Sequence, residues 1–401
     1  MIRMEQILND IDFLSAENDV PSVKTAHPDE PFSERAILFL SSLAFEINSS
    51  PLIRAYPDVA SFAFFCRKAN LLMLKKSYDD NLLRLGRGIV FHIAPSNVPV
   101  NFAYSLVAGI LSGNLNLVRI PSKEFPQVDI ICEAIKKVIQ QPENSYYHNR
   151  IFLFRYGKDQ SVTSFFSSLC DVRIIWGGDD TINQIRKSPI PSRAFDITFA
   201  DRYSFCIINA DEFIKEQHTD TIVTGFYNDT YLFDQNACSA PHLVIWTGKN
   251  VAKAKDIFWT SLQKVIEQKE YQISEVVAVG KWTSLLLQSV NCQIKKEKNT
   301  DNRLMRVTLL KLPSNIEQYR CIGGYFSEYT AFSINEIRHI VNRKYQTMSY
   351  YGFTKQTLMD ILKDLKLNGI DRVVPIGKTT DFSLKWDGYD LIRSLSRECC
   401  F

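Results

Sequence analysis

The first predicted strand of this 401-residue chain reads Gly88-Ile89-Val90-Phe91-His92-Ile93-Ala94, and Pro95-Ser96-Asn97-Val98-Pro99 follows it directly. An almost wholly apolar run between a glycine and a proline is typical of a strand buried on both faces of a parallel sheet. The loop after such a strand lies at the edge of the sheet where α/β proteins bind ligands. Asn97 is therefore a candidate donor to an oxyanion, although a helix cap is the commoner explanation of Asn, Ser and Pro at this position.

Strands and helices alternate along the chain beyond this segment. The pattern predicts helices at 102–111, 126–140 and 161–169, and strands at 115–120, 150–154 and 172–176. Thr198 to Asn209 adds a strand that is interrupted by the polar pair Asp201-Arg202, and a second alternation begins near residue 210. Single strands that alternate with helices predict an α/β protein with parallel sheets. Before residue 86 the spacing of apolar residues predicts amphipathic helices instead, at 35–46 and 59–75.

Composition excludes several classes of protein. With 47 basic and 44 acidic residues the net charge is +3, which does not favour a nucleic-acid or membrane-docking surface. The longest apolar run, Phe102 to Leu111, is too short to span a bilayer, and the N-terminus lacks the pattern of a signal peptide, so we expect a cytoplasmic protein. Nine irregularly spaced cysteines and six histidines without metal-ligand spacing predict neither a disulfide framework nor a metal site.

One cysteine stands out by its neighbours, in the run Asp234-Gln235-Asn236-Ala237-Cys238-Ser239-Ala240-Pro241-His242. Small side chains flank Cys238, and the run lies between a predicted helix and a predicted strand. An accessible thiol on a loop with free backbone N–H groups suits a nucleophile. A buried structural cysteine is the alternative, and it is the commoner fate of a cysteine when only these neighbours are considered.

Two more loops follow predicted strands. Arg119-Ile120-Pro121-Ser122-Lys123 offers two cations and a hydroxyl group, which suit a phosphate, and an ordinary solvated loop is the alternative. Gly177-Gly178-Asp179-Asp180 precedes a helix whose first N–H groups can hold a phosphate. Its two aspartates would repel an anion, so a simple capping turn explains this second loop at least as well.

Taken in order, these motifs resemble the LuxC-type fatty acyl-CoA reductases. The resemblance covers residues 45–397 and rests on these runs: Ile93 to Pro99, Gly113-Asn114, Val118 to Lys123, Trp176 to Asp180, Asp234 to Ser239, Gln346-Thr347-Met348-Ser349-Tyr350-Tyr351-Gly352, Arg372-Val373-Val374-Pro375-Ile376-Gly377, and Trp386-Asp387-Gly388-Tyr389.

The family is a branch of the aldehyde dehydrogenase superfamily, and the resemblance implies that fold: a Rossmann-type cofactor domain plus a second α/β catalytic domain, typically in a homo-oligomer. We therefore expect N-terminal helices and an NADP-binding domain at 1–209, a catalytic domain at 210–370, and a C-terminal segment at 371–401 that packs on the body or on an oligomer partner. Cys238 matches the family's nucleophile, and Asn97 matches the asparagine that helps to form the oxyanion hole.

The resemblance also implies cofactor contacts, from Pro95, Ser96, Arg119, Pro121, Ser122, Lys123, Gly177 and Gly178. The superfamily carries a glutamate at the position of Lys123, where it binds the ribose hydroxyl groups. Lysine attracts a 2′-phosphate instead, so we expect NADPH as the cofactor. Glu328, in Gly323-Gly324-Tyr325-Phe326-Ser327-Glu328, is similar to the glutamate that binds the nicotinamide ribose.

The implied reaction is reduction of a long-chain fatty acyl thioester to the aldehyde, through an acyl group on Cys238. Ile197 to Arg202 matches the segment that carries the hydrolytic glutamate of aldehyde dehydrogenases and has no carboxylate at that position, which favours reduction, although Asp201 lies close by. The resemblance leaves the acyl donor open between acyl-CoA, an acyl carrier and an acyl-protein synthetase partner. An acyl-carrying transferase subunit and an NAD(P)-dependent aldehyde dehydrogenase remain alternatives. Neither His92 nor His242 is identified as the activator of the thiol.

Overall fold

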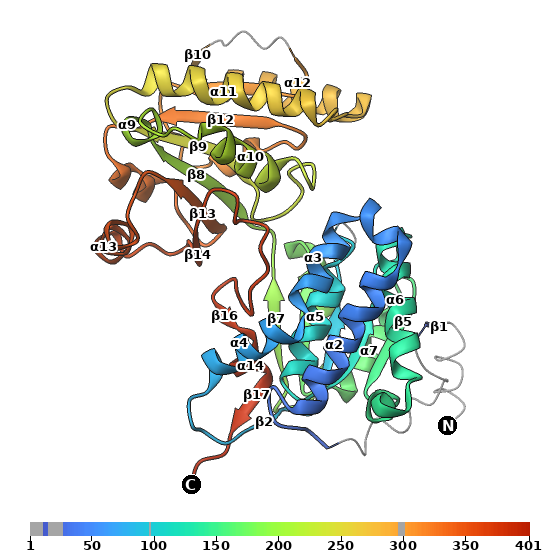
Figure 1. Ribbon diagram of the computed structural model, residues 1–401. Helices are drawn as coiled ribbons and strands as arrows, with labels where there is room; N and C mark the ends of the chain where they lie inside the picture. The colour runs from blue at the N-terminus through green and yellow to red at the C-terminus, as the bar shows by residue number, and fades with distance from the viewer. Residues whose placement is uncertain (1–10, 15–26, 96–97, 296–300) are drawn as a thin grey trace. The chain divides into compact units, whose positions relative to one another are not determined.

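The computed structural model describes residues 11–14, 27–95, 98–295 and 301–401. The chain forms two compact units, of which the first comprises Met1–Ala200 with Tyr389–Phe401 and the second Asp201–Gly388. Each unit is built on its own mainly parallel sheet (Figure 1). Within the described residues, no helix combines the length and the apolar character that crossing a membrane requires.

The first sheet has six strands in the order β1-β5-β4-β3-β6-β7. Its members are β1 (Asp12–Phe13), β5 (Ile151–Arg155), β4 (Leu115–Arg119), β3 (Ile89–Ile93), β6 (Val172–Trp176) and β7 (Phe195–Phe199). All neighbouring pairs are parallel except β1 with β5. The strands predicted from their apolar runs are confirmed, and β3 lies at the centre of the sheet, buried on both faces as its sequence predicts.

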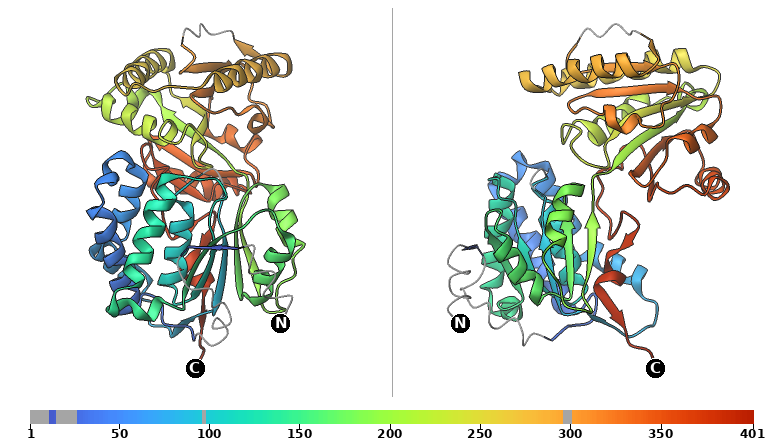
Figure 2. Two further views of the ribbon diagram at one scale, coloured as in Figure 1. Left: turned by 90° about the vertical axis from the view of Figure 1, so that its right-hand side faces the viewer. Right: turned by 180° about the vertical axis from the view of Figure 1, so that it is seen from behind.

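Helices cover both faces of the first sheet (Figure 2, left). On one face lie α2 (Glu34–Ser49), α5 (Asn101–Leu111) and α6 (Pro126–Ile139), and on the other α7 (Gln160–Leu169) and α8 (Asp179–Arg186). Phe166 of α7 stacks on Phe154 with 4.2 Å between ring centroids. The single helix predicted at 59–75 is wrong: the chain forms α3 (Pro57–Phe65) and α4 (Lys68–Tyr78), with Arg67 in an extended conformation between them and the Asn70 side chain donating to the Phe65 carbonyl at the end of the first helix.

The second sheet has seven strands in the order β10-β11-β12-β9-β8-β13-β14. Its members are β10 (Ile294–Lys295), β11 (Met305–Leu309), β12 (Tyr325–Thr330), β9 (Pro241–Thr247), β8 (Tyr203–Asn209), β13 (Tyr345–Tyr351) and β14 (Arg372–Pro375). Only β10 runs antiparallel to its neighbour.

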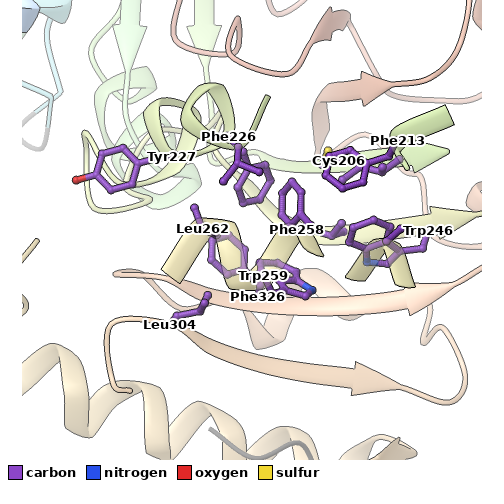
Figure 3. Close-up of a cluster of buried hydrophobic side chains, with 14 of the residues drawn as sticks. Cys206, Phe213, Phe226, Tyr227, Trp246, Phe258, Trp259, Leu262, Leu304 and Phe326 are labelled. Carbon is purple, nitrogen blue, oxygen red and sulfur yellow. The ribbon is translucent and has the colours of Figure 1, made fainter. Parts of the chain in front are cut away.

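An aromatic core fills one face of the second sheet. There α10 (Thr219–Thr230) and α11 (Val251–Gln268) bury Phe226, Phe258 and Trp259 against the strand residues Trp246 and Phe326 (Figure 3). The opposite face carries α12 (Glu275–Asn291) and α13 (Lys355–Leu365), which contact residues that alternate with the aromatic ones along the strands. The alternation of side chains in a strand thus gives the sheet two apolar faces.

Two expected boundaries need correction. The boundary between the units falls between Ala200 and Asp201 rather than at 209/210, because the predicted strand at 198–209 is two strands, β7 and β8, which belong to different sheets. The segment 371–401 is also divided: β14 pairs with β13 in the second unit, whereas β17 (Ser396–Glu398) pairs with β2 (Arg84–Gly86) in the first. Its last part thus belongs to the first unit.

Candidate functional site

The loop that carries Cys238 is held in place by Gln235. This side chain is only 1% exposed, and its amide nitrogen donates to the carbonyls of Pro241 and Tyr325 at 3.1 and 3.2 Å. Its amide oxygen accepts from the backbone N–H groups of Gly324 and Tyr325 at 2.7 and 2.9 Å. Four hydrogen bonds from one buried amide fasten the end of α10 to β9 and β12, and so fix the loop between them.

The backbone of this loop adopts an uncommon conformation. Asp234 and Gln235 both have positive φ angles, 52° and 58°, which L residues adopt at a cost. The Gln235 N–H donates to the Thr230 carbonyl at 2.7 Å and closes the end of α10. Two partly strained residues persist because the Gln235 bonds and the contact of Tyr271 Oη with Asp234 Oδ1 at 2.7 Å hold them.

Cys238 itself is half-buried, and side chains of β8 and β13 contact its carbonyl and its thiol. Ser204 Oγ of β8 donates to the Cys238 carbonyl at 2.7 Å and accepts from the Thr347 N–H of β13 at 3.1 Å. Gln346 Nε2 donates to Cys238 Sγ at 3.3 Å, and the same nitrogen donates to a carboxylate oxygen of Asp387. The Thr347 hydroxyl donates to Gln346 Oε1 at 3.3 Å, which fixes the orientation of this amide.

Burial is the main effect that opposes ionisation of the Cys238 thiol in the resting protein. Burial and the nearby Asp387 carboxylate raise the pKa of Cys238 to about 12, while the Gln346 hydrogen bond and Arg202 act in the opposite direction. Burial raises the pKa of Asp387 to about 6, again partly offset by Gln346 and Arg202. Cys238 is therefore a neutral thiol at neutral pH, and Asp387 is predominantly a carboxylate.

Among the residues that the structure describes, no hydrogen bond joins His92 or His242 to the Cys238 sulfur. His242 lies buried in β9, where Nδ1 contacts the Cys321 carbonyl at 3.2 Å and the ring stacks on Tyr203. His92 is fully buried in β3, between Ser105 Oγ at 2.8 Å and Asn116 Oδ1 at 3.1 Å. Burial lowers the pKa of each imidazole to about 4, so both are neutral residues of the interior.

The predicted cofactor residues of the first unit gather at one edge of its sheet. Pro95 follows β3, Pro121 to Lys123 follow β4, and Gly177 and Gly178 follow β6 and lead into α8. Because β3, β4 and β6 are parallel neighbours, their carboxyl ends lie side by side, where α/β sheets bind ligands. Ser96 and Asn97 lie outside the described residues.

Two cations of this edge differ in their environment. Arg119 ends β4, and its guanidinium donates to the Gly157 carbonyl at 3.1 Å and lies over the Tyr156 ring. Ser122 and Lys123 are exposed, and Lys123 Nζ lies 5.0 Å from the centre of the Phe125 ring. Lys123 therefore offers its charge to a ligand, while Arg119 is largely engaged by the neighbouring loop. The backbone at Gly178 is open as well, since no atom lies within 4 Å of where a Cβ would stand.

Glu328 occupies a different kind of position. It is 1% exposed in β12, and its Oε2 accepts from the indole N–H groups of Trp246 and Trp259 at 3.2 and 3.0 Å. Oε1 accepts from Thr308 Oγ1 at 2.8 Å, and Lys255 Nζ lies 3.4 Å from Oε2. Both oxygens are thus engaged inside the aromatic core, so the nicotinamide-ribose prediction for Glu328 gains no support from its position.

Gln346 and Asp387 receive no role from the sequence, although both lie within the family motifs. Asp201, the acidic residue near the position of the missing glutamate, forms an ion pair with Arg320, whose Nη2 donates to both carboxylate oxygens at 2.6 and 2.7 Å. Among the described residues, no group of three or more His, Cys, Asp or Glu side chains is placed to hold a metal ion.

The chain has two units, each with a mainly parallel sheet, and the second unit carries a cysteine on the loop before its central strand β9. This arrangement is the aldehyde dehydrogenase fold. Solved structures agree: a mutant of Thermus thermophilus 1-pyrroline-5-carboxylate dehydrogenase is similar with a TM-score of 0.65 and 14% identity, over 99% of this chain and 85% of that one. Aldehyde dehydrogenase 21 from Physcomitrella patens is similar with a TM-score of 0.66 and 10% identity, over 99% and 89%.

The sequence places the chain more narrowly. Residues 71–398 match the model of the family described as acyl-CoA reductase (LuxC), and the chain belongs to that family. It is 22% identical over 80% of its length to the long-chain acyl-protein thioester reductase of Photorhabdus luminescens, and 21% identical over 78% to that of Vibrio harveyi. The matches span 64% and 63% of those relatives, so the chain covers less than two thirds of their length.

Proposed function

We propose that this protein reduces a long-chain fatty acyl thioester to the aldehyde, with Cys238 carrying the acyl group in between. The observation that carries the proposal is the Cys238 loop, because its thiol is half-buried, is held by Gln235 and Ser204, and has an amide donor aimed at the sulfur. Membership of the acyl-CoA reductase family, and relatives named acyl-protein thioester reductases, support the same reaction.

In the first half of the reaction, Cys238 Sγ attacks the carbonyl carbon of the thioester. A carbon–sulfur bond to Cys238 forms, the bond to the donor sulfur breaks, and the thiol proton ends on the departing donor thiol. The Asn97 side chain and the Cys238 N–H are the proposed donors to the oxyanion. Loss of one such donor typically raises a barrier by roughly 2.7–4 kcal/mol.

In the second half, a nicotinamide cofactor, when bound, would supply a hydride. The acyl carbon receives the hydride, the bond to Cys238 breaks, and the aldehyde leaves while the sulfur regains a proton. Water must not reach the acyl-enzyme, since hydrolysis would release the acid. The engagement of Asp201 by Arg320 fits this requirement, because both of its carboxylate oxygens already accept from Arg320 Nη2.

We assign Gln346 and Asp387 a positioning role at the thiol. The Asp387 carboxylate accepts one N–H of the Gln346 amide, and the other N–H then faces Cys238 Sγ. A hydrogen bond of this kind stabilises developing negative charge on sulfur, both when the thiol attacks and when it is expelled. The amide cannot accept the thiol proton as a histidine would, so the contribution of Gln346 is this hydrogen bond alone.

For the cofactor we propose NADPH, bound at the edge formed by the ends of β3, β4 and β6. Pro95, Ser96, Pro121, Ser122, Gly177 and Gly178 would line it, and Arg119 would flank it. The exposed Lys123 ammonium favours a 2′-phosphate, whereas a carboxylate at this position would favour the free ribose hydroxyl groups.

The acyl donor is proposed to be acyl-CoA, an acyl carrier or an acylated synthetase partner, and the names of the relatives favour an acylated protein. The test is to supply long-chain acyl-CoA with NADPH and to follow both NADPH oxidation and aldehyde. We expect the two in equal amounts, no activity in Cys238→Ala, and retained activity in Cys321→Ala, which changes another half-buried cysteine. Acylation of Cys238 without aldehyde would favour an acyl-carrying subunit, and acid formed from aldehyde would favour a dehydrogenase.

A further inference from the structure

Helix α12 carries its apolar side chains on the outside. Six of them are between 45% and 82% exposed: Val276, Val279, Trp282, Leu286, Leu287 and Val290. At 100° per residue these six positions fall within one side of the helix. Isolated exposed apolar residues are ordinary, but six on one helical face form a continuous patch, and such patches usually mark a contact surface.

The opposite side of α12 is fixed to the second unit by polar groups. Lys281 is fully buried, and its Nζ donates to the carbonyls of Asn302 and Gly323. Gln288 is also fully buried and exchanges hydrogen bonds with Ser327 Oγ at 2.9 Å and Tyr325 Oη at 2.7 Å. Rotating the helix to bury its apolar side would leave an ammonium and an amide without partners, which is costly. The outward direction of the apolar side is therefore set by the fold.

The spacing on the exposed side is that of a coiled-coil seam. Val276, Val279, Thr283, Leu286 and Val290 follow one another at alternating steps of three and four residues, as a and d positions do over two heptads. Glu275 and the buried Lys281 are the only charged residues of the helix, so this side carries no charge at its centre. An uncharged seam of this kind is complementary to a copy of itself, and a charged partner would find nothing to pair with.

The size of the patch is suited to a stable contact. Six side chains of this exposure present on the order of 600 Å² of apolar area, the upper end of what a monomer ordinarily exposes and near the per-partner area of standard interfaces. A pair of helices that meet along such a seam buries the apolar area of both copies at once.

We propose that α12 packs antiparallel against α12 of a second copy of this chain, about a two-fold axis at Thr283. Thr283 is the middle residue of Glu275–Asn291, so this axis sets Val276 opposite Val290 and Val279 opposite Leu287. It also sets Leu286 opposite Gly280, where no atom lies within 4 Å of a Cβ position. The small residues at the centre let the two helices approach closely.

The first test is the mass of the protein in solution by light scattering, for the unmodified chain and for Leu286→Glu. Burying two carboxylates in the seam should weaken the association on the order of 100-fold and halve the mass. The control Met359→Glu changes an exposed residue of α13 on the same face of the sheet and should leave the mass unchanged. A monomeric unmodified chain, or an unchanged mass in Leu286→Glu, would overturn the proposal.

The second test does not depend on that variant folding. In a chain with Cys400→Ser, Thr283→Cys places the new thiols of two copies at the two-fold axis, where mild oxidation should link them. Glu267→Cys, on the exposed side of α11, is the matched control and should link far more slowly. Equal rates for the two positions would mean that α12 does not meet its copy. Neither test depends on the proposed enzymatic activity.

Discussion

The positioning role of Gln346 and Asp387 predicts opposite effects of two substitutions on the reactivity of Cys238. Gln346→Leu removes the amide donor from Sγ while keeping a side chain of similar size. A hydrogen bond to a charged group contributes about 1.5–3 kcal/mol, and one pKa unit corresponds to about 1.36 kcal/mol. Loss of the hydrogen bond from Gln346 should therefore raise the pKa of the Cys238 thiol by about one to two units and slow its alkylation at fixed pH roughly ten- to hundredfold.

Asp387→Asn should act in the other direction, because it removes a negative charge next to the sulfur. One nitrogen lies within hydrogen-bonding distance of both Sγ and the carboxylate, so these atoms are at most roughly 6 Å apart, where like charges repel by about 3 kcal/mol at an effective dielectric constant of ~20. Asp387 is partly exposed, and solvent reduces this figure. We expect the thiol pKa to fall and alkylation to become about tenfold faster.

The assay is the rate of iodoacetamide alkylation of Cys238 between pH 6.5 and 9.5, followed by peptide mass spectrometry. Asp364→Asn, on the exposed surface of α13, is the charge-matched control and should leave the rate unchanged. Asp387→Asn should nevertheless reduce turnover, because the Gln346 amide loses the carboxylate that fixes it. If both variants changed the alkylation rate in the same direction, or neither did, the assigned roles would be wrong.

Three further predictions concern the loop, the cofactor and the second unit. Gln235→Leu removes four hydrogen bonds of about 1 kcal/mol each and should lower the free energy of unfolding by about 4 kcal/mol in urea titrations, and an unchanged midpoint would refute its role. Lys123→Glu should raise the KM for NADPH at least tenfold and lower that for NADH; equal effects on both cofactors would contradict the phosphate contact. Burial raises the pKa of Asp229 to about 6, above its unfolded value, so this group contributes stability at low pH that is lost as pH rises through about 6. Asp229→Asn should flatten the fall in melting temperature from about pH 4 to about pH 6, and parallel curves for the two proteins would contradict this assignment.

Much of the fold could be predicted from periodicity because both sheets are parallel and their strands are nearly all apolar. The β3 to β6 strands and the helices between them lie within a few residues of their expected bounds. The expected boundary between the units is misplaced because β7 and β8 are separated by only three residues and resemble a single interrupted strand. Local sequence carries no sign that such a strand continues into a different sheet.

The site was predictable only in part, for a similar reason. Cys238 stands out through its small neighbours and its family motif. Gln346 lies 108 residues away and reaches the sulfur only because β13 pairs with β8, while Asp387 enters through a turn beyond β14. Glu328 lies in a run that is similar to a superfamily motif, but its side chain is buried and accepts hydrogen bonds from Trp246 and Trp259. The local sequence of Glu328 did not indicate these surroundings.

The most direct test of the proposed chemistry is to find where an acyl group attaches. The protein is incubated with a panel of acyl-CoAs of different chain length without NADPH, and its intact mass and peptides are measured by mass spectrometry. We predict one acyl group per chain, on Cys238, favoured for long chains, absent from Cys238→Ala and released as aldehyde when NADPH is added. Acylation of another cysteine, or none with any donor including an acylated protein, would contradict the role of Cys238 as the acyl carrier.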